Sequence, residues 1–302
     1  MYPTRPGRLH LLQAAGVLLV LLIAQQQQLI TIQGSGRVAS AWPDAIHGAW
    51  FACVTWIVLS LVGSRYRRSV TVLSTVGIGV AIAVGTELLQ AVTGGDAEVG
   101  DVCFDMIGMT AAICAWCGHR KLIPRRLGVA LAALLMLVSL WPIVPPLLLD
   151  RYRDSIAPDL VRFDSPRASE LVSSSSVAQI EAAPDGWSIT GPVLGITLAA
   201  EKWPGVYLAD PIPDWRRYST LEVDAFVEGR APMPITISVR LDHASVDHVY
   251  RQFTCAPGPC RLRLPFADLF DRAVARVNAV VIYSERDQAG RMFFLGRVAL
   301  RE

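Results

Sequence analysis

The chain has 302 residues, of which 52% are apolar and 18% charged, and its mean hydropathy is +0.39. This length suffices for two domains, and the hydropathy is high for a soluble protein. The net charge is only +2, and the sequence has no nucleic-acid-binding motif or basic face with interleaved aromatics, which argues against a nucleic-acid partner. Because the long apolar runs are concentrated in residues 1–149, we expect a membrane domain over 1–149 and an extracytoplasmic domain over 150–302.

Five segments are long and apolar enough to cross a bilayer, which takes about 20 residues. In chain order, we expect spans at about 11–32, 44–62, 70–92, 101–117 and 127–149. The first span has a rival interpretation as a signal peptide, because Arg5 and Arg8 precede its apolar run. We favour a retained helix, since no convincing small-x-small cleavage site follows. Pro142, Pro145 and Pro146 predict an irregular end to the fifth span.

Basic residues in the short loops set the orientation of these spans. Nine of them fall on one side, namely Arg5, Arg8, Arg65, Arg67, Arg68, Arg120, Lys121, Arg125 and Arg126. The opposite loops contain only Arg37, together with the acidic Asp96 and Glu98. We therefore expect a multi-pass protein of the bacterial cytoplasmic (inner) membrane, in contact with membrane lipids. Its N-terminus is cytoplasmic in this interpretation and its C-terminal domain extracytoplasmic.

Two pairs of cysteines have suggestive spacings. Cys255 and Cys260 flank the turn APGP between two strand-like runs. In an oxidising compartment this pair is placed to form a disulfide, and two free thiols are the alternative. Cys114 and Cys117 have redox-motif spacing, but they lie in an apolar helix without a βαβ context, so we expect ordinary helix packing there.

The C-terminal half is rich in strand signals punctuated by Pro, Gly and Asp. The runs are GWSITG, GVYLAD, STLEVDAFVEG, PITISVRLDH, CRLRLPF, VNAVVIYSE and RMFFLGRVAL. PFADLFDRAVA predicts one short helix, and SSSS at 173–176 predicts an exposed loop. The expected fold class is thus a five-span α-helical transmembrane bundle followed by an all-β antiparallel sandwich.

Six polar residues interrupt the predicted spans near their extracytoplasmic ends. They form three pairs, each sharing a helical face: Asp44 and His47, Glu87 and Gln90, and Asp101 and Asp105. At about 1.5 Å rise per residue, the three pairs lie at a similar depth. Because a charge within a span must be paired or neutralised, we expect these residues to form one outward-facing polar pocket.

Structural roles are the alternatives for some of these residues. Asp44 follows a proline and Asp101 follows a glycine, so each is placed to cap a helix N-terminus. The glutamine suits an interfacial position, and the histidine suits helix packing. Glu87 and Asp105 have no capping role available. We therefore prefer a functional pocket to a polar lock between helices.

Such a pocket suits acid–base catalysis or cation binding. In a catalytic version Glu87 or Asp105 acts as the acid or base, and His47 relays the proton. The other three polar residues orient a head group or a cation. Alternatively, the carboxylates and the imidazole ligate a divalent cation. The spacing matches no particular metal motif, so it leaves the metal, and whether a reaction occurs at all, undetermined.

The polar pairs also carry a resemblance, which covers about residues 10–120. Their order is Asp44-x2-His47, Glu87-x2-Gln90 and Asp101-x3-Asp105-x2-Gly108. This resembles the D-x-x-H, E-x-x-Q and D-x-x-x-N-x-x-G signatures of the VanZ-like family of bacterial membrane proteins. Asp105 stands where that family usually has Asn, and Asp96 falls near a position that is commonly basic. The family is named after a protein linked to low-level teicoplanin resistance, so the resemblance implies a cell-envelope role rather than a particular reaction.

A second, weaker resemblance covers the C-terminal half. The stretch WPGVYLADPIPDWRRYSTLEVDAFVEG, followed by PITISVRLDH and RMFFLGRVALRE, is similar to jelly-roll modules of the galactose-binding-like, carbohydrate-binding kind. The resemblance implies a jelly-roll sandwich. It makes Trp187, Trp203, Trp215 and Tyr218 candidates for stacking on sugar rings. Core or rim packing is the alternative for each of them.

The sequence thus predicts a membrane protein whose outer-leaflet pocket acts on or binds a lipid-linked envelope precursor or a polysaccharide, in a role like that of glycopeptide-resistance proteins. The alternative is a non-catalytic, membrane-anchored carbohydrate-binding protein, with polar residues that only lock the helices together. A transporter is disfavoured, because the inner halves of spans 44–62, 70–92 and 101–117 carry no ionisable side chain.

Overall fold

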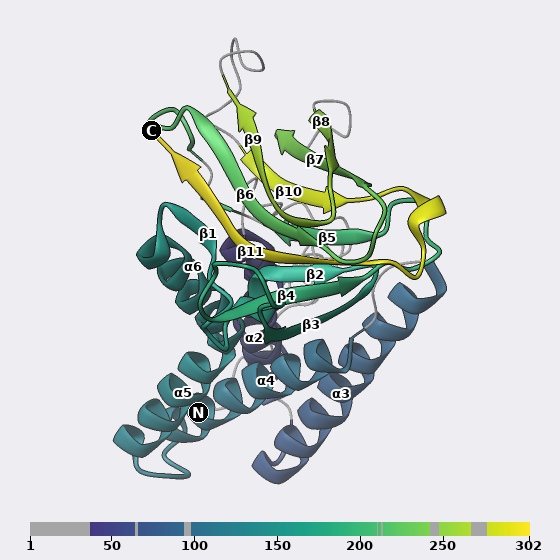
Figure 1. The fold of residues 1–302 in the computed structure, drawn as a ribbon. Coiled ribbons are helices and arrows are strands. Elements are labelled where there is room, and N and C mark those ends of the chain that lie inside the picture. Colours follow the sequence, from purple (N-terminus) through teal and green to yellow (C-terminus); the bar gives the residue numbers. More distant parts are fainter. Residues whose placement is uncertain are drawn as a thin grey trace. The chain divides into compact units, whose positions relative to one another are not determined.

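The computed structural model describes residues 37–63, 66–93, 98–209, 211–212, 214–241, 248–266 and 277–302. Helices come first along the chain and strands follow (Figure 1). The chain divides into two compact units. The described part of the first is 38–146, and that of the second is 147–302 together with Arg37. The predicted span at 11–32 lies outside the described residues, as do Asp96 and most of PFADLFDRAVA.

Four long helices make up most of the first unit. They are α2 (Arg37–Val62), α3 (Arg68–Thr93), α4 (Val99–His119) and α5 (Arg125–Ser139), after which come the 3-10 turn η1 (Trp141–Ile143) and α6 (Val144–Ile156). Four segments are long and apolar enough to cross a membrane: Ala41–Val62, Arg68–Thr93, Val99–His119 and Arg125–Ile156. The helices expected from residues 44, 70, 101 and 127 are therefore present. The prolines of the last segment lie in the 3-10 turn and at the start of α6. The α-helix is interrupted there by the 3-10 turn and then continues as α6.

Neither aspartate caps a helix, so the capping alternatives are wrong. Helix α2 runs through Pro43, which leaves Asp44 in the helix interior. A proline there removes one backbone hydrogen bond, but it does not end this helix. In α4 the N-cap position belongs to Glu98, and Asp101 lies inside the first turn. Both side chains are therefore available for contacts other than with their own helix ends.

Small residues bring the helices of the first unit close together. A Cβ added to Gly108 of α4 would lie 2.7 Å from the carbonyl carbon of Gly48 in α2. A Cβ on Gly118 would lie 3.2 Å from the Cα of Gly128, where α4 meets α5. Contacts this short exclude larger side chains, and glycine at helix crossings is typical of packing in membranes.

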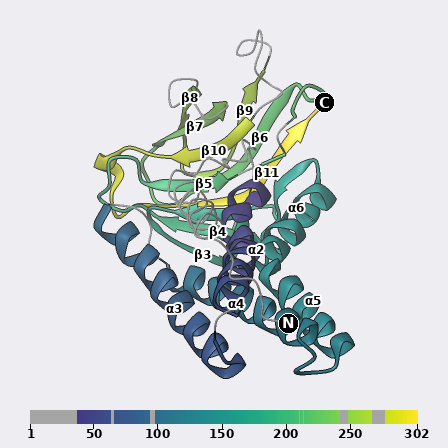
Figure 2. The ribbon, with the colours of Figure 1, turned by 180° about the vertical axis from the view of Figure 1, so that it is seen from behind.

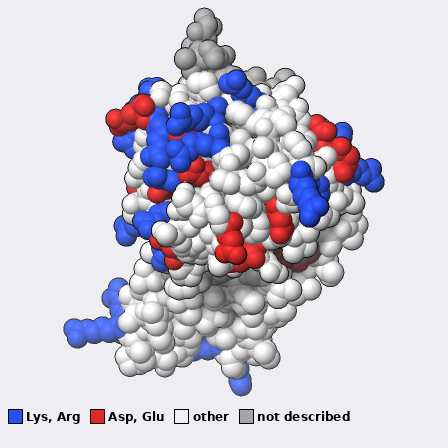
Figure 3. Space-filling model, in the orientation of Figure 1, with Lys and Arg blue, Asp and Glu red and all other residues white. Residues whose placement is uncertain are grey.

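Helix α3 has polar residues on its buried face and apolar residues on its exposed face. Its buried residues recur every four positions, at Thr71, Thr75, Gly79, Ala83 and Glu87. Its exposed face instead carries large apolar side chains, among them Leu73, Leu88 and Val92. Figure 3 shows that the face of the helical unit in view is almost free of charge, apart from a few Lys and Arg side chains at its edges. Burial of polar groups and exposure of apolar ones favour a lipid environment.

The second unit is a sandwich of two antiparallel sheets (Figures 1 and 2). Sheet A contains, in spatial order, β3 (Val177–Ala182), β4 (Pro192–Thr197), β11 (Met292–Arg301), β6 (Thr220–Val227) and β9 (Gly258–Pro265), with β1 (Asp159–Val161) also paired to β11. Sheet B contains β2 (Val172–Ser174), β5 (Gly205–Ala209), β10 (Val277–Tyr283), β7 (Met233–Leu241) and β8 (His248–Cys255). Most connections between β4 and β11 cross from one sheet to the other, a connectivity typical of a jelly roll. Two short elements complete the unit, α7 (Ala168–Leu171) and η2 (Arg286–Gln288).

Inward-pointing residues of both sheets form the sandwich core. Leu221, Ile237, Ile282 and Phe293 are completely buried in it. They alternate with outward-pointing residues along their strands, and this alternation gave the period-two pattern in the sequence. The expectation of apolar helices followed by a β-sandwich is confirmed.

Two local expectations in this half need correction. GWSITG is not a strand, because Gly186 and Gly191 have φ values of 82° and 127° and the residues between them form a loop. The ring of Trp187 in this loop packs against Phe226, with centroids 5.7 Å apart. The SSSS segment is exposed but only partly a loop, since its first two serines belong to β2.

Candidate functional sites

The first candidate site is built around His47, between two carboxylates of α4. Its Nδ1 hydrogen-bonds Oδ1 of Asp105 at 3.1 Å, and its Nε2 lies 3.8 Å from Oδ2 of Asp101. Asp105 is completely buried, whereas the side chains of His47 and Asp101 are each 14% exposed. The two aspartates are four residues apart on one face of α4, so a single imidazole from α2 reaches both.

The second part of this site is Glu87, near the end of α3. Its Oε2 accepts a hydrogen bond from the backbone N–H of Glu98, at 3.0 Å. With the amide of Gln90 turned so that its nitrogen faces the carboxylate, that nitrogen donates to both oxygens of Glu87, at 3.1 and 3.0 Å. Because Glu98 is the N-cap residue of α4, the carboxylate also lies at the positive end of that helix dipole.

Charge interactions join the two parts. Asp101 interacts electrostatically with His47, Glu87 and Asp44. Asp44 takes part through its charge, and the other five residues through hydrogen bonds or ion pairs. We call these six residues, all predicted from the sequence, the polar cluster: Asp44, His47, Glu87, Gln90, Asp101 and Asp105.

The polar cluster has an excess of negative charge. It contains four carboxylates, and within the described residues no Lys or Arg forms an ion pair with any of them. Nor does that part of the chain contain three His, Cys, Asp or Glu side chains arranged to hold a metal ion. Oδ2 of Asp105 is buried without a hydrogen-bond partner. This oxygen is an acceptor that lacks a donor.

The four aromatic residues proposed for sugar stacking differ in how far they are exposed. Trp215 is completely buried and Tyr218 nearly so, which makes both unsuitable as stacking platforms. The expectation is wrong for these two because their apolar rings fill the core. Trp187 packs on sheet A, as described above. Trp203 is 55% exposed, and its ring contacts that of Tyr283 edge-on with centroids 5.3 Å apart.

The outer face of sheet B gathers further aromatic residues around Trp203. Cross-strand pairing aligns Tyr207, Val281, Ser238 and Tyr250 in one row. The neighbouring row contains Gly205, Tyr283, Thr236 and Gln252. We call the exposed or half-buried side chains of this surface the aromatic face: Trp203, Tyr207, Arg240, Tyr250, Gln252 and Tyr283.

Polar contacts hold the aromatic face in place. The guanidinium carbon of Arg240 lies 5.6 Å from the ring centroid of Tyr207. Gln252 donates to Glu285 at 2.6 Å. Burial, with a smaller contribution from nearby Tyr250, raises the pKa of the Tyr283 hydroxyl, so it stays neutral and able to donate. These tyrosines were not among the predicted stacking residues, although their outward register in GVYLAD and VNAVVIY was a usable signal.

The outer face of sheet A is different in kind, because it carries a network of ion pairs. Glu222 accepts from Arg263 at 3.0 Å and from Arg301 at 3.3 Å, and Asp224 accepts from Arg261 at 2.7 Å. Figure 3 shows Lys and Arg gathered on the sandwich unit with acidic side chains between them. These charges satisfy one another within the sheet.

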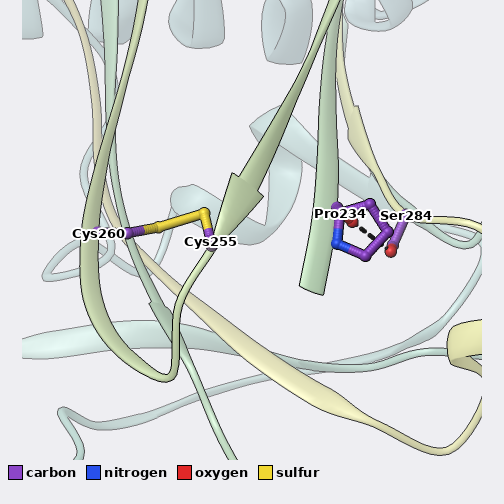
Figure 4. The surroundings of a disulfide bond; sticks show 4 residues. All are labelled: Pro234, Cys255, Cys260 and Ser284. Atoms are coloured by element: carbon purple, nitrogen blue, oxygen red, sulfur yellow. Dashed lines mark hydrogen bonds between the residues drawn. A yellow bond between two sulfur atoms is a disulfide. The ribbon is translucent and has the colours of Figure 1, made fainter. Parts of the chain in front are cut away.

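A disulfide joins Cys255 at the end of β8 to Cys260 in β9 (Figure 4). Their Cα atoms are 6.0 Å apart, and the bond links an edge strand of sheet B to sheet A. The same view shows the Ser284 hydroxyl donating to the carbonyl of Pro234. Both contacts restrain strands that carry the aromatic face. The four helical cysteines are free.

No family model matches the chain, and no curated protein sequence matches it. The resemblance to the VanZ-like family therefore has no support beyond its motifs. Among solved structures, the chain is similar to an exo-β-agarase, at 10% identity and a TM-score of 0.40, over 48% of this chain and 25% of that one. The chain spans about a quarter of the length of the agarase structures that it matches.

Two further matches are one smaller module and one larger structure of two modules. One is a family 11 carbohydrate-binding module from Clostridium thermocellum in complex with a β-1,3-1,4-mixed-linked tetrasaccharide, at 14% identity and a TM-score of 0.31, over 43% of this chain and 86% of that one. The other contains the CBM22-1 and GH10 modules of a Clostridium thermocellum xylanase complexed with xylohexaose, at 12% identity and a TM-score of 0.35, over 47% and 27%. With TM-scores below 0.5, these similarities carry no argument about function.

Proposed function

We propose that this chain is a membrane-anchored protein whose β-sandwich binds carbohydrate on the aromatic face of sheet B. One observation carries the proposal: exposed Trp203 and Tyr250 lie on the same sheet face as Tyr207 and Tyr283, interleaved with hydrogen-bonding side chains. A sugar ring has apolar C–H faces and hydroxyl edges. Aromatic rings pack against the first, and hydroxyl, amide and guanidinium groups bond the second.

The two outer faces of the sandwich differ in what they leave available. On sheet A the charged side chains of β6, β9 and β11 are paired with one another. On sheet B the strands are held by the Cys255–Cys260 disulfide, and Tyr250 is 62% exposed. A rigid sheet that presents aromatic rings needs little ordering when a ligand binds, which favours affinity.

The membrane anchor in this proposal is the helical unit. Its four apolar segments are long enough to span, and the basic residues of the loops predict that the sandwich is extracytoplasmic. A disulfide suits that oxidising location. The sandwich would then hold the protein against a polysaccharide of the envelope.

A second candidate function concerns the polar cluster, acting on or binding a lipid-linked envelope substrate. The observation that favours it is the buried acceptor oxygen of Asp105, which has no donor. A cluster that only locked helices together would be expected to satisfy all of its buried atoms.

Carbohydrate binding is tested with the full chain in lipid nanodiscs, which avoid sugar-headed detergents. A panel of polysaccharides is screened, and the ligand found is titrated against Trp203→Ala and Tyr250→Ala. Loss of one stacking ring is worth about 1–1.5 kcal/mol, or about tenfold in Kd. The matched control is Ile180→Ala, a truncation of a side chain that is 43% exposed on sheet A. The proposal fails if no polysaccharide binds, or if all three variants bind like the wild type.

A further inference from the structure

The polar cluster contains a hydrogen-bonding deficit that points to a ligand. Asp105 is completely buried and commits Oδ1 to His47, whereas its Oδ2 has no partner. A buried acceptor without a donor is costly, and more so where water is scarce. The neighbouring Asp101 and His47 are 14% exposed, so these two side chains reach the surface of the bundle beside Asp105.

The sign of the missing group follows from the charges that face it. From α2 come Asp44 and His47, from α3 Glu87, and from α4 Asp101 and Asp105. The described residues supply no Lys or Arg ion pair to these carboxylates. Even a protonated imidazole would neutralise only one of the four. The group that completes the cluster is therefore a cation that donates hydrogen bonds.

The arrangement of acceptors distinguishes between kinds of cation. Divalent metal ions take six or more oxygen ligands at short distances, and the described residues contain no three ligating side chains grouped for a metal. A primary ammonium group instead donates three separate hydrogen bonds to acceptors spread around it. Glu87 already accepts from Glu98 and Gln90, which leaves Asp44 and the two aspartates of α4 as acceptors, and of these Asp105 has the buried oxygen without a donor.

The cluster also lies at the depth of head groups. Asp101 is the third residue of α4 and Asp105 the seventh, and Glu87 lies six residues before the end of α3. At about 1.5 Å per residue these side chains are within about 10 Å of a helix end. An ammonium at the end of a lipid head group, or on a small soluble amine, reaches this depth without entering the centre of the bilayer.

We propose that the polar cluster binds a primary ammonium group, with Oδ2 of Asp105 and the carboxylate of Asp101 accepting its N–H bonds and His47 holding Asp105 in position. This site is independent of the carbohydrate face. The ammonium comes either from the ethanolamine head group of a phospholipid or from a free amine. Both sources share the same chemistry and differ in whether the lipid tail is needed.

The test measures binding to the purified full chain in phosphatidylcholine nanodiscs. Native mass spectrometry counts retained phosphatidylethanolamine against phosphatidylcholine, whose quaternary ammonium has no N–H donor. Titrations with ethanolamine and with tetramethylammonium make the same comparison without a lipid tail. We expect the primary ammonium to bind about tenfold more tightly than its quaternary counterpart in at least one of these arms. Preference in the lipid arm alone identifies the head group as the source, and preference in both arms identifies the amine itself.

Variants assign the effect to the cluster. Asp105→Asn and Asp101→Asn should each weaken binding of the primary ammonium about tenfold, and Asp154→Asn, at a 65% exposed carboxylate, should leave it unchanged. If burial makes Asp105→Asn unstable, the part-exposed Asp101→Asn still decides the matter. Equal binding of primary and quaternary ammonium overturns the proposal, as does unchanged binding in Asp101→Asn. Stabilisation by Ca²⁺ or Mg²⁺ in place of the amine also overturns it, in favour of a metal.

Discussion

Among the described glycines of the helical unit, Gly108 of α4 has the tightest surroundings, against the backbone of Gly48 in α2, and it gives the sharpest prediction. A Cβ on Gly108 would lie 2.7 Å from the carbonyl carbon and 2.9 Å from the Cα of Gly48. Ordinary carbon–carbon contacts are about 3.5–4.0 Å. The obstacle is backbone rather than a flexible side chain. Gly108→Ala must therefore push the two helices apart by about 1 Å.

The expected cost has two parts. Overpacking of this kind destabilises by about 1–3 kcal/mol. Separation of the helices also weakens the bond between His47 and Asp105, whose loss is worth about 1.5 kcal/mol or more for a charged partner. We therefore expect Gly108→Ala to lower the free energy of unfolding by about 2–4 kcal/mol.

Gly85 of α3 supplies the matched control, because a Cβ there would meet nothing within 4 Å. Gly85→Ala should be neutral or stabilising by up to about 1 kcal/mol, since alanine is the better helix former. Reversible unfolding of the full chain in mixed micelles compares the two variants with the wild type. If Gly108→Ala unfolds within about 0.5 kcal/mol of Gly85→Ala, helices α2 and α4 do not meet as described.

Three further predictions concern the sandwich. Burial alone would raise the pKa of Glu222, but the hydrogen bond and charges of its arginine neighbours hold it below 4.5. The ionised carboxylate therefore stabilises the fold above pH 4.5, and this contribution disappears as the pH falls through the native pKa. Since those arginines are more than a third exposed, Glu222→Gln should lower the unfolding free energy by only about 1–2 kcal/mol at pH 7. The unfolding free energy of the variant should also fall less steeply than that of the wild type as the pH is lowered. An equally steep fall in both proteins would contradict this. Replacing Cys255 and Cys260 with serine, which opens a loop with a sequence separation of 5, should cost about 2 kcal/mol and abolish any effect of dithiothreitol on unfolding. Ile237→Ala in the core should cost about 2–5 kcal/mol in the same unfolding measurement, whereas Ile180→Ala on the surface should cost less than about 0.5.

Strand prediction succeeded where a strand has one buried and one outward face. Apolar and polar residues alternate in the central strands β6 and β7, because each has one face over the core, whereas β10 and β11 contain consecutive buried residues. The edge strand β8 was missed, since Val249 and Phe253 are only half-buried and Tyr250, Arg251, Gln252 and Thr254 are exposed. GWSITG shows the opposite failure. Its apolar and polar residues do alternate. The sequence pattern did not indicate the positive φ values at both ends or the packing of Trp187 over sheet A.

The sequence indicated which residues gather in the polar cluster, but not which of them contact one another. Spacings of three and four residues placed each pair on one helix face, and the apolar context marked the carboxylates as unusual. The partner of each residue depends on how helices cross, which a single sequence does not report. His47 hydrogen-bonds Asp105, 58 positions away, and Glu87 bonds a backbone N–H rather than another side chain.

The crossing of α2 and α4 explains why a glycine follows Asp105 at a distance of three residues. His47 is short for a side chain that must span two helices, so the backbones have to approach closely at its level. Gly48 is its immediate neighbour in α2, and Gly108 lies about one turn beyond Asp105 in α4. A Cβ on Gly108 would collide with the backbone of Gly48, whereas a Cβ on Gly48 would collide chiefly with the side chain of Ser139 in α5. The histidine, the aspartate and Gly108 therefore form a single geometric unit, and a substitution at Gly108 should disturb ligand binding at the cluster as well as stability.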